Sequence, residues 1–319
     1  KIRKYDTWHA MGQGATTGSL VVTLEALKEM HLTPEDIQLI QNDTKTCPDT
    51  GMAGASRSLY MDGNATIIAA NKLLAAMRKE DGTLRTYDEM KAEGIETKYL
   101  GRYETNTTPG LCRLDPNTGI GDPTPAFTYC LNLAEVEVDT KTGKTTVLKF
   151  TCVDFVGRIG NIDAVNGQAY SGIMHGIGFA LKEDYADVKK HANMFGAGTS
   201  YIKDVPDDIN LIHIDGAISD GPFGSSGASE AFQASGHCAV LNGIYNACGV
   251  RIHEIPALPE KVKAGLDAIA KGEKPYEPKK YFLGSDMYEE LENIKENPVQ
   301  VGTQSFYVSL DDPTAERPF

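Results

Sequence analysis

Short loops of glycine and other small residues that lead into helical patterns constrain this fold more than any other feature of the sequence. Three such loops occur, at residues 12–17 (Gly-Gln-Gly-Ala-Thr-Thr), 54–58 (Gly-Ala-Ser-Arg-Ser) and 224–230 (Gly-Ser-Ser-Gly-Ala-Ser-Glu). A related stretch, residues 160–168, starts with Gly-Asn and ends with Gly-Gln. In chain order we call these four the first (12–17), second (54–58), third (160–168) and fourth (224–230) segments.

These segments suit an anionic or bulky ligand. Without β-carbons, backbone N–H groups can approach phosphate or pyran oxygens closely, and the start of a helix adds partial positive charge. The side chains of Ser56, Arg57 and Ser58 can donate further hydrogen bonds. Any single loop is explained more simply as a tight turn before a helix. Four together favour a large ligand that is held at several points.

No standard nucleotide motif accounts for the loops. The first segment has Thr17 where a dinucleotide fingerprint has its third glycine, and no strand-like run is predicted before it. A Walker lysine is absent as well. The sequence therefore predicts neither a Rossmann nor a P-loop nucleotide site.

Apolar spacing predicts helices after the loops, together with a β-hairpin. The hairpin covers residues 133–150, with a turn at 139–144 that contains a glycine. A Thr-Pro-Glu-Asp run at residues 33–36 predicts the start of a short helix. The other expected helices cover approximately residues 20–30, 59–77, 164–181, 231–248 and 258–270. The fold class is therefore α+β.

One irregular stretch suggests a division of the chain. Residues 103–124 are rich in Pro, Gly, Asn and Thr, as expected of a surface connection. We therefore expect two mixed α/β subdomains, residues 1–125 and 126–257. Residues 258–319 would form a C-terminal extension of one helix and an extended tail.

Composition excludes several function classes. The 319 residues carry a net charge of -13, which repels nucleic acid and anionic lipid. No apolar run reaches the roughly 20 residues of a membrane-spanning helix. The six cysteines are widely spaced, without a zinc or iron–sulfur motif, and we expect reduced, mostly buried thiols of a cytoplasmic protein.

Glu230 is the candidate general base. It follows small residues at an expected helix start, where the helix dipole would stabilise a carboxylate. The simpler interpretation is an ordinary helix-start glutamate. A hydrolase built from Ser225, His237 and Glu230 is a third interpretation, but no G-x-S-x-G elbow presents the serine. His175 and His237 are expected to be packed and hydrogen-bonded rather than metal ligands.

The four segments, in this order, resemble the molybdenum hydroxylases of the xanthine oxidase family. The likeness extends from about residue 8 to residue 266, and covers the second half of their molybdenum-binding region. It is greatest to the bacterial aldehyde oxidoreductases that use molybdopterin cytosine dinucleotide. The resemblance implies a molybdopterin-binding domain of two subdomains with a C-terminal extension.

The resemblance also implies roles for particular residues. Glu230 corresponds to the family's essential glutamate, which deprotonates the labile hydroxyl or water beside the metal. The pterin dithiolene holds the metal, so no protein side chain is an expected metal ligand. The residues expected to contact the cofactor are Gly12, Gln13, Gly14, Ala15, Thr16, Ala55, Ser56, Arg57, Ser58, Asn161, Gln168, Ser226, Gly227, Ala228 and Ser229.

The implied activity is the oxidation of aldehydes to carboxylic acids, with water as the oxygen source. The implied cofactor is molybdenum or tungsten with molybdopterin cytosine dinucleotide. Electrons would leave through [2Fe-2S] clusters on partner segments, and FAD on those segments is left open as a further cofactor. Expected partners are the other half of the molybdenum-binding region and an iron–sulfur domain or subunit, within an oligomer. Two alternatives remain open, hydroxylation of an N-heterocycle such as a purine or nicotinate, and a non-catalytic cofactor-carrying module.

Overall fold

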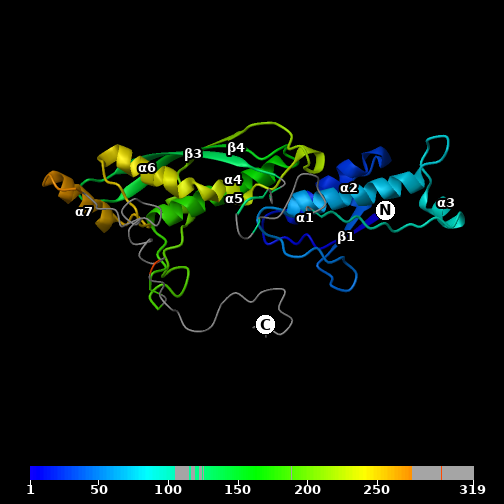
Figure 1. The fold of residues 1–319 in the computed structure, drawn as a ribbon, viewed down its shortest axis with the longest axis horizontal. Coiled ribbons are helices and arrows are strands. Elements are labelled where there is room, and N and C mark those ends of the chain that lie inside the picture. The colour runs from blue at the N-terminus through cyan, green and yellow to red at the C-terminus, as the bar shows by residue number, and fades with distance from the viewer. Residues whose placement is uncertain are drawn as a thin grey trace. The chain divides into compact units, whose positions relative to one another are not determined.

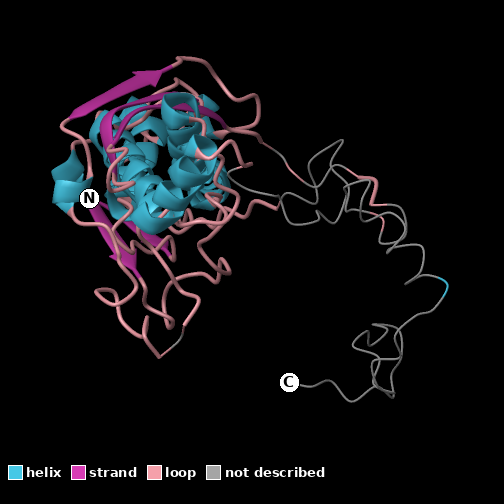
Figure 2. Cartoon of the chain, turned by 90° about the vertical axis from the view of Figure 1, so that its left-hand side faces the viewer, coloured by secondary structure: helices cyan, strands magenta, loops and turns pink. Residues whose placement is uncertain are grey.

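The computed structural model describes residues 1–104, 115, 119–121, 124, 126–187, 189–274 and 296. Figure 2 shows the described helices in cyan, strands in magenta and loops in pink, with the residues outside the described ranges in grey. The predicted boundary at residues 125 and 126, and nearly all of the predicted tail, lie outside or at the edge of the described residues. The division into 1–125, 126–257 and 258–319 therefore stays a prediction.

The N-terminal part consists of two strands and three helices. Strand β1 (Ile2–Asp6) pairs in parallel with β2 (Ile37–Gln41), and Ile2 is opposite Ile37. Between them are helix α1 (Ala15–Ala26) and two 3-10 turns, Lys28–Met30 and Pro34–Asp36. Helices α2 (Ser58–Met77) and α3 (Tyr87–Ala92) follow.

Two predictions for this part were wrong. A strand, β1, does precede the first segment. Its inward positions include the charged Lys4 and Asp6, which ion-pair with each other, so the usual apolar alternation is missing. The short helix predicted from Thr33 is only a 3-10 turn, because strand β2 begins at Ile37 and continues the chain in extended form.

The C-terminal part is built around a three-stranded sheet of order β3-β4-β5. Strands β3 (Tyr129–Val138) and β4 (Thr145–Phe155) form the predicted hairpin, and β5 (Asp208–His213) pairs in parallel with β4. Gly143 in the hairpin turn has φ +78°, as the turn requires. The remaining elements are α4 (Ile162–Leu181), 3-10 turns at Ile202–Asp204 and Pro222–Gly224, α5 (Ser229–Ala234), α6 (Gly236–Cys248) and α7 (Pro259–Ala270).

The main core lies between this sheet and its helices. Figure 1 shows α4 and α6 running along the β3–β4 sheet. Phe150 from β4, Ile173 from α4, Phe232 from α5 and Ile244 from α6 are all 0% exposed and belong to one cluster. A smaller cluster joins α1 to α2 through Leu27, Ala70 and Leu74. The mixture of helices and strands agrees with the α+β prediction.

Two further observations concern the sequence predictions. Among the described residues, no helix is long and apolar enough to cross a membrane. The cysteines are free where described, but the expectation that they are mostly buried was wrong. Among the described cysteines, only Cys152 is buried. Cys47, Cys130 and Cys248 are partly exposed, and Cys238 in α6 is exposed. Cys112 lies outside the described residues.

Candidate active site

The second segment adopts a backbone conformation that side chains rarely take. Ala55 has φ +53° and Ser56 has φ +51°, and neither is glycine. Each such residue costs on the order of 1–3 kcal/mol, and strain of this kind is found mostly at functional sites. The turn brings the Ser56 side chain toward the fourth segment, immediately before α2 begins at Ser58.

Ser56 and Glu230 are joined by two hydrogen bonds across 174 positions of sequence. The Ser56 hydroxyl donates to Glu230 Oε2 at 2.9 Å, and its oxygen accepts from the Glu230 backbone N–H at 3.1 Å. The carboxylate is exposed. Within the described part of the chain, its second oxygen, Oε1, has no hydrogen-bond partner. Ser56 therefore holds the carboxylate in place while leaving one oxygen open.

Gly227 makes this approach possible. A β-carbon at this position would lie 1.5 Å from the Ser56 carbonyl oxygen, far inside any permitted contact. The fourth segment therefore needs glycine there so that its backbone can lie against the second segment. Glu230 is the second residue of α5, as predicted, but α5 has only six residues. A helix so short contributes little dipole, and Ser56 is the stronger local influence on the carboxylate.

The third segment joins the same cluster. Ser229 Oγ donates to Gln168 Oε1 at 2.7 Å, which links α5 to α4 directly beside Glu230. Asn161 caps α4, because its side chain accepts from the Ala164 N–H at 3.1 Å. Gly167, one residue before Gln168, is exposed, and a β-carbon there would meet nothing within 4 Å. Packing therefore does not explain this glycine.

The first segment lies against the third. A β-carbon on Gly14 would contact Ala164 Cβ at 3.7 Å, and Gly14 has φ +83° as the N-cap of α1. Neither α1 nor α2 has a side-chain cap among the described residues, so the first N–H groups of both helices keep their donor capacity. Contacts thus connect all four segments in a chain of pairs, first to third, third to fourth and fourth to second.

Several predicted contact residues have side chains or N–H groups that are already engaged. Gln13 folds back on its own loop, donating to the His9 carbonyl at 3.0 Å. The Arg57 guanidinium donates to the Met52 carbonyl at 3.0 Å, and the Ser226 N–H to the Val156 carbonyl at 3.2 Å. Gly12, Ala15, Thr16, Ala55, Ser58 and Ala228 could contribute backbone atoms. The contact roles of all these residues stay predictions.

A buried polar cluster that was not predicted from the sequence lies behind the third segment. His213 Nδ1 lies 2.7 Å from Asp154 Oδ2, and its Nε2 lies 2.8 Å from Asn166 Oδ1. Burial raises the pKa of Asp154, although the nearby His213 opposes this shift. One signal was available: Asp154 is at an inward position of β4, two residues after the buried Cys152, where an unpaired acid would be costly.

The other candidates from the sequence were a hydrolase triad and two packed histidines. Among the described residues, no hydrogen bond joins Ser225, His237 and Glu230, so a hydrolase triad is not assembled. His175 is exposed rather than packed, but its Nδ1 lies 3.5 Å from Gln233 Nε2, so the predicted hydrogen bond is present. His237 Nε2 lies 3.4 Å from Cys238 Sγ, while its buried Nδ1 has no hydrogen-bond partner among the described residues. The described residues contain no group of three or more His, Cys, Asp or Glu side chains arranged to hold a metal.

Comparison with known proteins identifies the class to which this fold and these segments belong. Residues 2–206 match the family model of the molybdopterin cofactor-binding domain. The chain belongs to this family, and the predicted membership in the molybdenum hydroxylases is confirmed.

Individual relatives point in the same direction. The aldehyde oxidoreductase of Megalodesulfovibrio gigas is 42% identical over 267 residues, which are 84% of this chain and 29% of that protein. The crystal structure of the aldehyde oxidoreductase from Desulfovibrio desulfuricans ATCC 27774 superposes with a TM-score of 0.78 at 45% identity, covering 82% of this chain and 28% of that one. A probable hypoxanthine oxidase of Escherichia coli K12 is 28% identical over 277 residues, 82% of this chain and 29% of that protein. The chain thus spans less than a third of the length of these relatives.

Proposed function

We propose that this chain is the part of a molybdenum-dependent aldehyde oxidoreductase that binds the cofactor and carries the catalytic glutamate. The enzyme would convert aldehydes to carboxylic acids, with water as the oxygen source. One observation carries the proposal: Ser56 and Glu230 are hydrogen-bonded where the second and fourth segments meet, and one carboxylate oxygen remains open. The aldehyde oxidoreductases at 42% and 45% identity support this substrate class over others.

The residues present fit a molybdopterin cofactor with a dinucleotide arm. The uncapped starts of α1 and α2 offer backbone N–H donors to phosphate or pterin oxygens. Gly167 leaves room beside Gln168 for a ligand to approach the backbone. We propose molybdopterin cytosine dinucleotide as the form bound, with iron–sulfur clusters on other segments of the enzyme. When bound, the cofactor supplies the redox chemistry and takes up the electrons of the substrate.

The chain's own residues hold and move a proton. Glu230 Oε1 would accept the proton released when oxygen from water is added to the carbonyl carbon of the aldehyde. The Ser56 hydroxyl fixes the carboxylate through Oε2, so that only Oε1 faces the reacting atoms. Ser229 and Gln168 fix the start of α5, and with it the backbone of Glu230. Such fixed orientation reduces the entropy that must be lost on reaching the transition state.

The variant Glu230→Gln, made in the intact enzyme that carries this chain, tests the proposal. Glutamine keeps the shape and can still accept from Ser56, but it cannot take up a proton. We expect kcat for aldehyde oxidation to fall by about 10²-fold to 10⁴-fold, while molybdenum and pterin contents stay at the wild-type level. Steady-state kinetics with an artificial electron acceptor, together with metal and pterin analysis, measure both quantities.

Glu260→Gln is the matched control, since Glu260 is an exposed glutamate in the first turn of α7 and should tolerate the change. Wild-type kcat in Glu230→Gln would remove the general-base role. Wild-type enzyme that contains neither molybdenum nor tungsten would remove the proposed function as a whole. Retained cofactor with no oxidation of any substrate would instead indicate a non-catalytic carrier.

A second substrate class has one observation in its favour. The E. coli relative at 28% identity is named a probable hypoxanthine oxidase, which acts on an N-heterocycle rather than an aldehyde. Comparing kcat/KM for a panel of aldehydes with that for purines and nicotinate separates the two. Higher kcat/KM for the heterocycles would overturn the aldehyde assignment and keep the general-base role of Glu230.

A further inference from the structure

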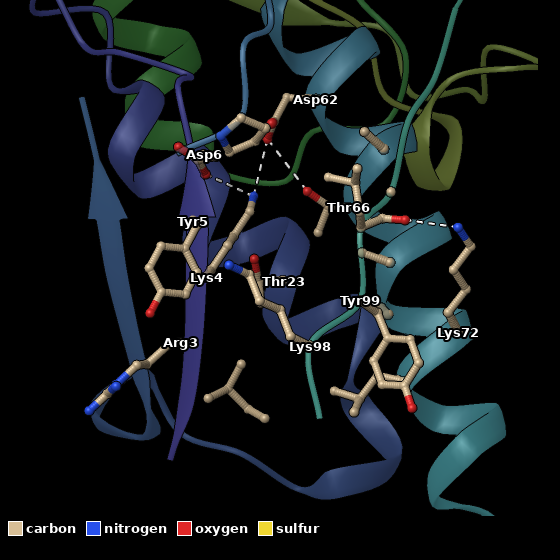
Figure 3. Close-up of a pocket in the computed structure, with 18 of the residues that line it drawn as sticks. Arg3, Lys4, Tyr5, Asp6, Thr23, Asp62, Thr66, Lys72, Lys98 and Tyr99 are labelled. Atoms are coloured by element: carbon tan, nitrogen blue, oxygen red, sulfur yellow. Dashed lines mark hydrogen bonds and ion pairs between the residues drawn. The ribbon is translucent and has the colours of Figure 1, made fainter. Parts of the chain in front are cut away.

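A buried ion cluster around Lys4 lies in the N-terminal part, outside the candidate active site. The ammonium of Lys4 on β1 donates to Ser19 Oγ at 2.7 Å, and it lies 3.1 Å from Asp6 Oδ2 and 3.1 Å from Asp62 Oδ2. Figure 3 shows Lys4 between the two carboxylates. These three partners use all three N–H donors of the ammonium.

The cluster is held from outside as well. Asp6 is 2% exposed and accepts from Ser19 Oγ at 2.5 Å and from Gln41 Nε2 at 2.7 Å. Thr66 donates to Asp62 Oδ2 at 3.4 Å. Burial raises the pKa of Asp62, Lys4 opposes this shift, and the charge of Asp6 adds to it. Two acids share one ammonium here, so loss of the ammonium would leave two buried carboxylates without a counter-charge.

The partners of Lys4 come from elements that carry the predicted cofactor loops. Ser19 lies one turn after Ala15, where α1 leaves the first segment. Asp62 lies one turn after Ser58, where α2 leaves the second segment. A helical turn is only about 5.4 Å long, so a shift of either side chain moves the helix start by a similar amount. Lys4 therefore connects the origins of both loops to β1.

Apolar packing between β1, α1 and α2 lies farther from the loops than the ion cluster does. A cavity of about 2490 Å³ is lined by β1, by Arg57 and the first turns of α2 that carry Ser58 and Asp62, and by residues 96–104. Ile2 of β1 packs against the cluster of Leu27, Ala70 and Leu74, which lies about two helical turns beyond Ser19 and Asp62. Near the loops, the Lys4–Asp62 ion pair connects β1 to the start of α2.

We propose that Lys4 is a positioning residue: through Ser19 and Asp62 it sets the distance between the first and second segments, and so the fit of the cofactor between them. The inference rests on the proposed function, because it assigns these segments to the cofactor. Lys4 itself touches no substrate or cofactor. Its effect should appear as the rate at which the bound pterin leaves the enzyme, rather than as loss of the chemical step.

Two variants of the intact enzyme cut the connections one at a time. Asp62→Leu removes the ion pair between Lys4 and α2 and leaves the Lys4–Asp6 pair, whose charges cancel. Ser19→Ala removes the hydrogen bond between Lys4 and α1 with a minimal change of volume. We expect each to release pterin about 10-fold faster than wild type, a size typical for residues that orient a cofactor's ligands at one remove. Asp62→Asn keeps an oxygen that can accept from Lys4 and should restore slow release. Pterin fluorescence after timed gel filtration in mild urea gives the rate.

The control separates positioning from general stability. Asp204→Leu breaks the Lys182–Asp204 ion pair, which is partly buried, with side chains 31% and 21% exposed against 11% and 12% for Lys4 and Asp62, and which lies at the C-terminal end of α4. It should lower the thermal midpoint without changing the pterin release rate. Wild-type release rates in both Asp62→Leu and Ser19→Ala, or equally fast release in Asp204→Leu, would overturn the inference. If Asp62→Leu fails to fold, Ser19→Ala decides alone. Wild-type enzyme without pterin would instead contradict the proposed function.

Discussion

At the scale of single residues, sequence identified Glu230 but not what holds it. The residue stood out because it ends a run of small residues, whereas its partner Ser56 is 174 positions away and only the folded chain joins them. The same limit hid Lys4, Asp6 and Asp62, since each is an ordinary charged residue until its neighbours are known. Gly227 shows the reverse case, because a glycine in a small-residue run is visible in sequence, while its contact with the Ser56 backbone is not.

Asp154 gives a prediction at this scale. Burial raises its pKa, so the folded chain keeps a proton on Asp154 at pH values where the unfolded chain has lost it. The stabilising contribution is then complete below the ordinary aspartate pKa of about 3.9 and is lost as pH rises through the raised value. We expect the free energy of unfolding of the wild type, minus that of Asp154→Asn, to fall as pH rises from about 3.5. Urea denaturation at a series of pH values measures this difference.

Asp43 should show the opposite dependence of stability on pH, because its pKa is lowered rather than raised. Hydrogen bonds from the Thr46 hydroxyl and the Lys45 backbone N–H lower the pKa of Asp43. The free energy of unfolding of the wild type, minus that of Asp43→Asn, should therefore grow as pH rises from the lowered pKa of Asp43 to the ordinary aspartate pKa. If the free energy of unfolding of the wild type, minus that of Asp154→Asn, also grew with pH, the effect of His213 on the pKa of Asp154 would outweigh that of burial.

At the scale of elements, apolar periodicity predicted most helices and the hairpin. It did not predict strand β1, because charged residues occupy inward positions of that strand. The glycines of α4 show how far such reasoning extends. Glycine within a helix is unfavourable by up to about 1 kcal/mol against alanine, and either close packing or an approaching ligand would justify it. Close packing is confirmed at Gly172 and Gly176, where a β-carbon would lie 2.6 Å from Phe232 Cβ and 2.9 Å from Gly236 Cα. Gly167 has no such neighbour among the described residues.

Two substitutions in α4 separate these reasons. Gly176→Ala should lower the free energy of unfolding by about 1–3 kcal/mol, because α6 must move away from α4. Gly167→Ala should leave it unchanged or raise it by up to about 1 kcal/mol, the usual gain of alanine in a helix. Guanidinium denaturation of both variants provides the comparison. Equal losses would show that packing does not explain the glycines, and lower pterin content in Gly167→Ala alone would favour ligand approach.

At the scale of the whole molecule, the least predictable feature is which face of the β3–β4–β5 sheet stays open. Leu131 and Leu133 of β3 are 63% and 56% exposed, whereas the smaller Ala134 faces the helices. Leu131, Val153 and Ile212 are register partners across the three strands, so an apolar row crosses the outer face. Apolar residues occur at both parities of β3, and hydropathy alone therefore could not choose its inner side.

An open apolar face of this kind should make the chain associate with itself when it is prepared alone, since soluble monomers seldom expose contiguous apolar patches. We expect the average mass in sedimentation velocity to rise with protein concentration. The double variant Leu131→Lys/Leu133→Lys should suppress that rise without altering the circular dichroism spectrum, because both side chains point away from the core. Tyr87→Lys, at a similarly exposed residue in α3, should leave the association unchanged. Suppression by Tyr87→Lys as well would assign the effect to added positive charge on a chain of net charge -13 rather than to the sheet face.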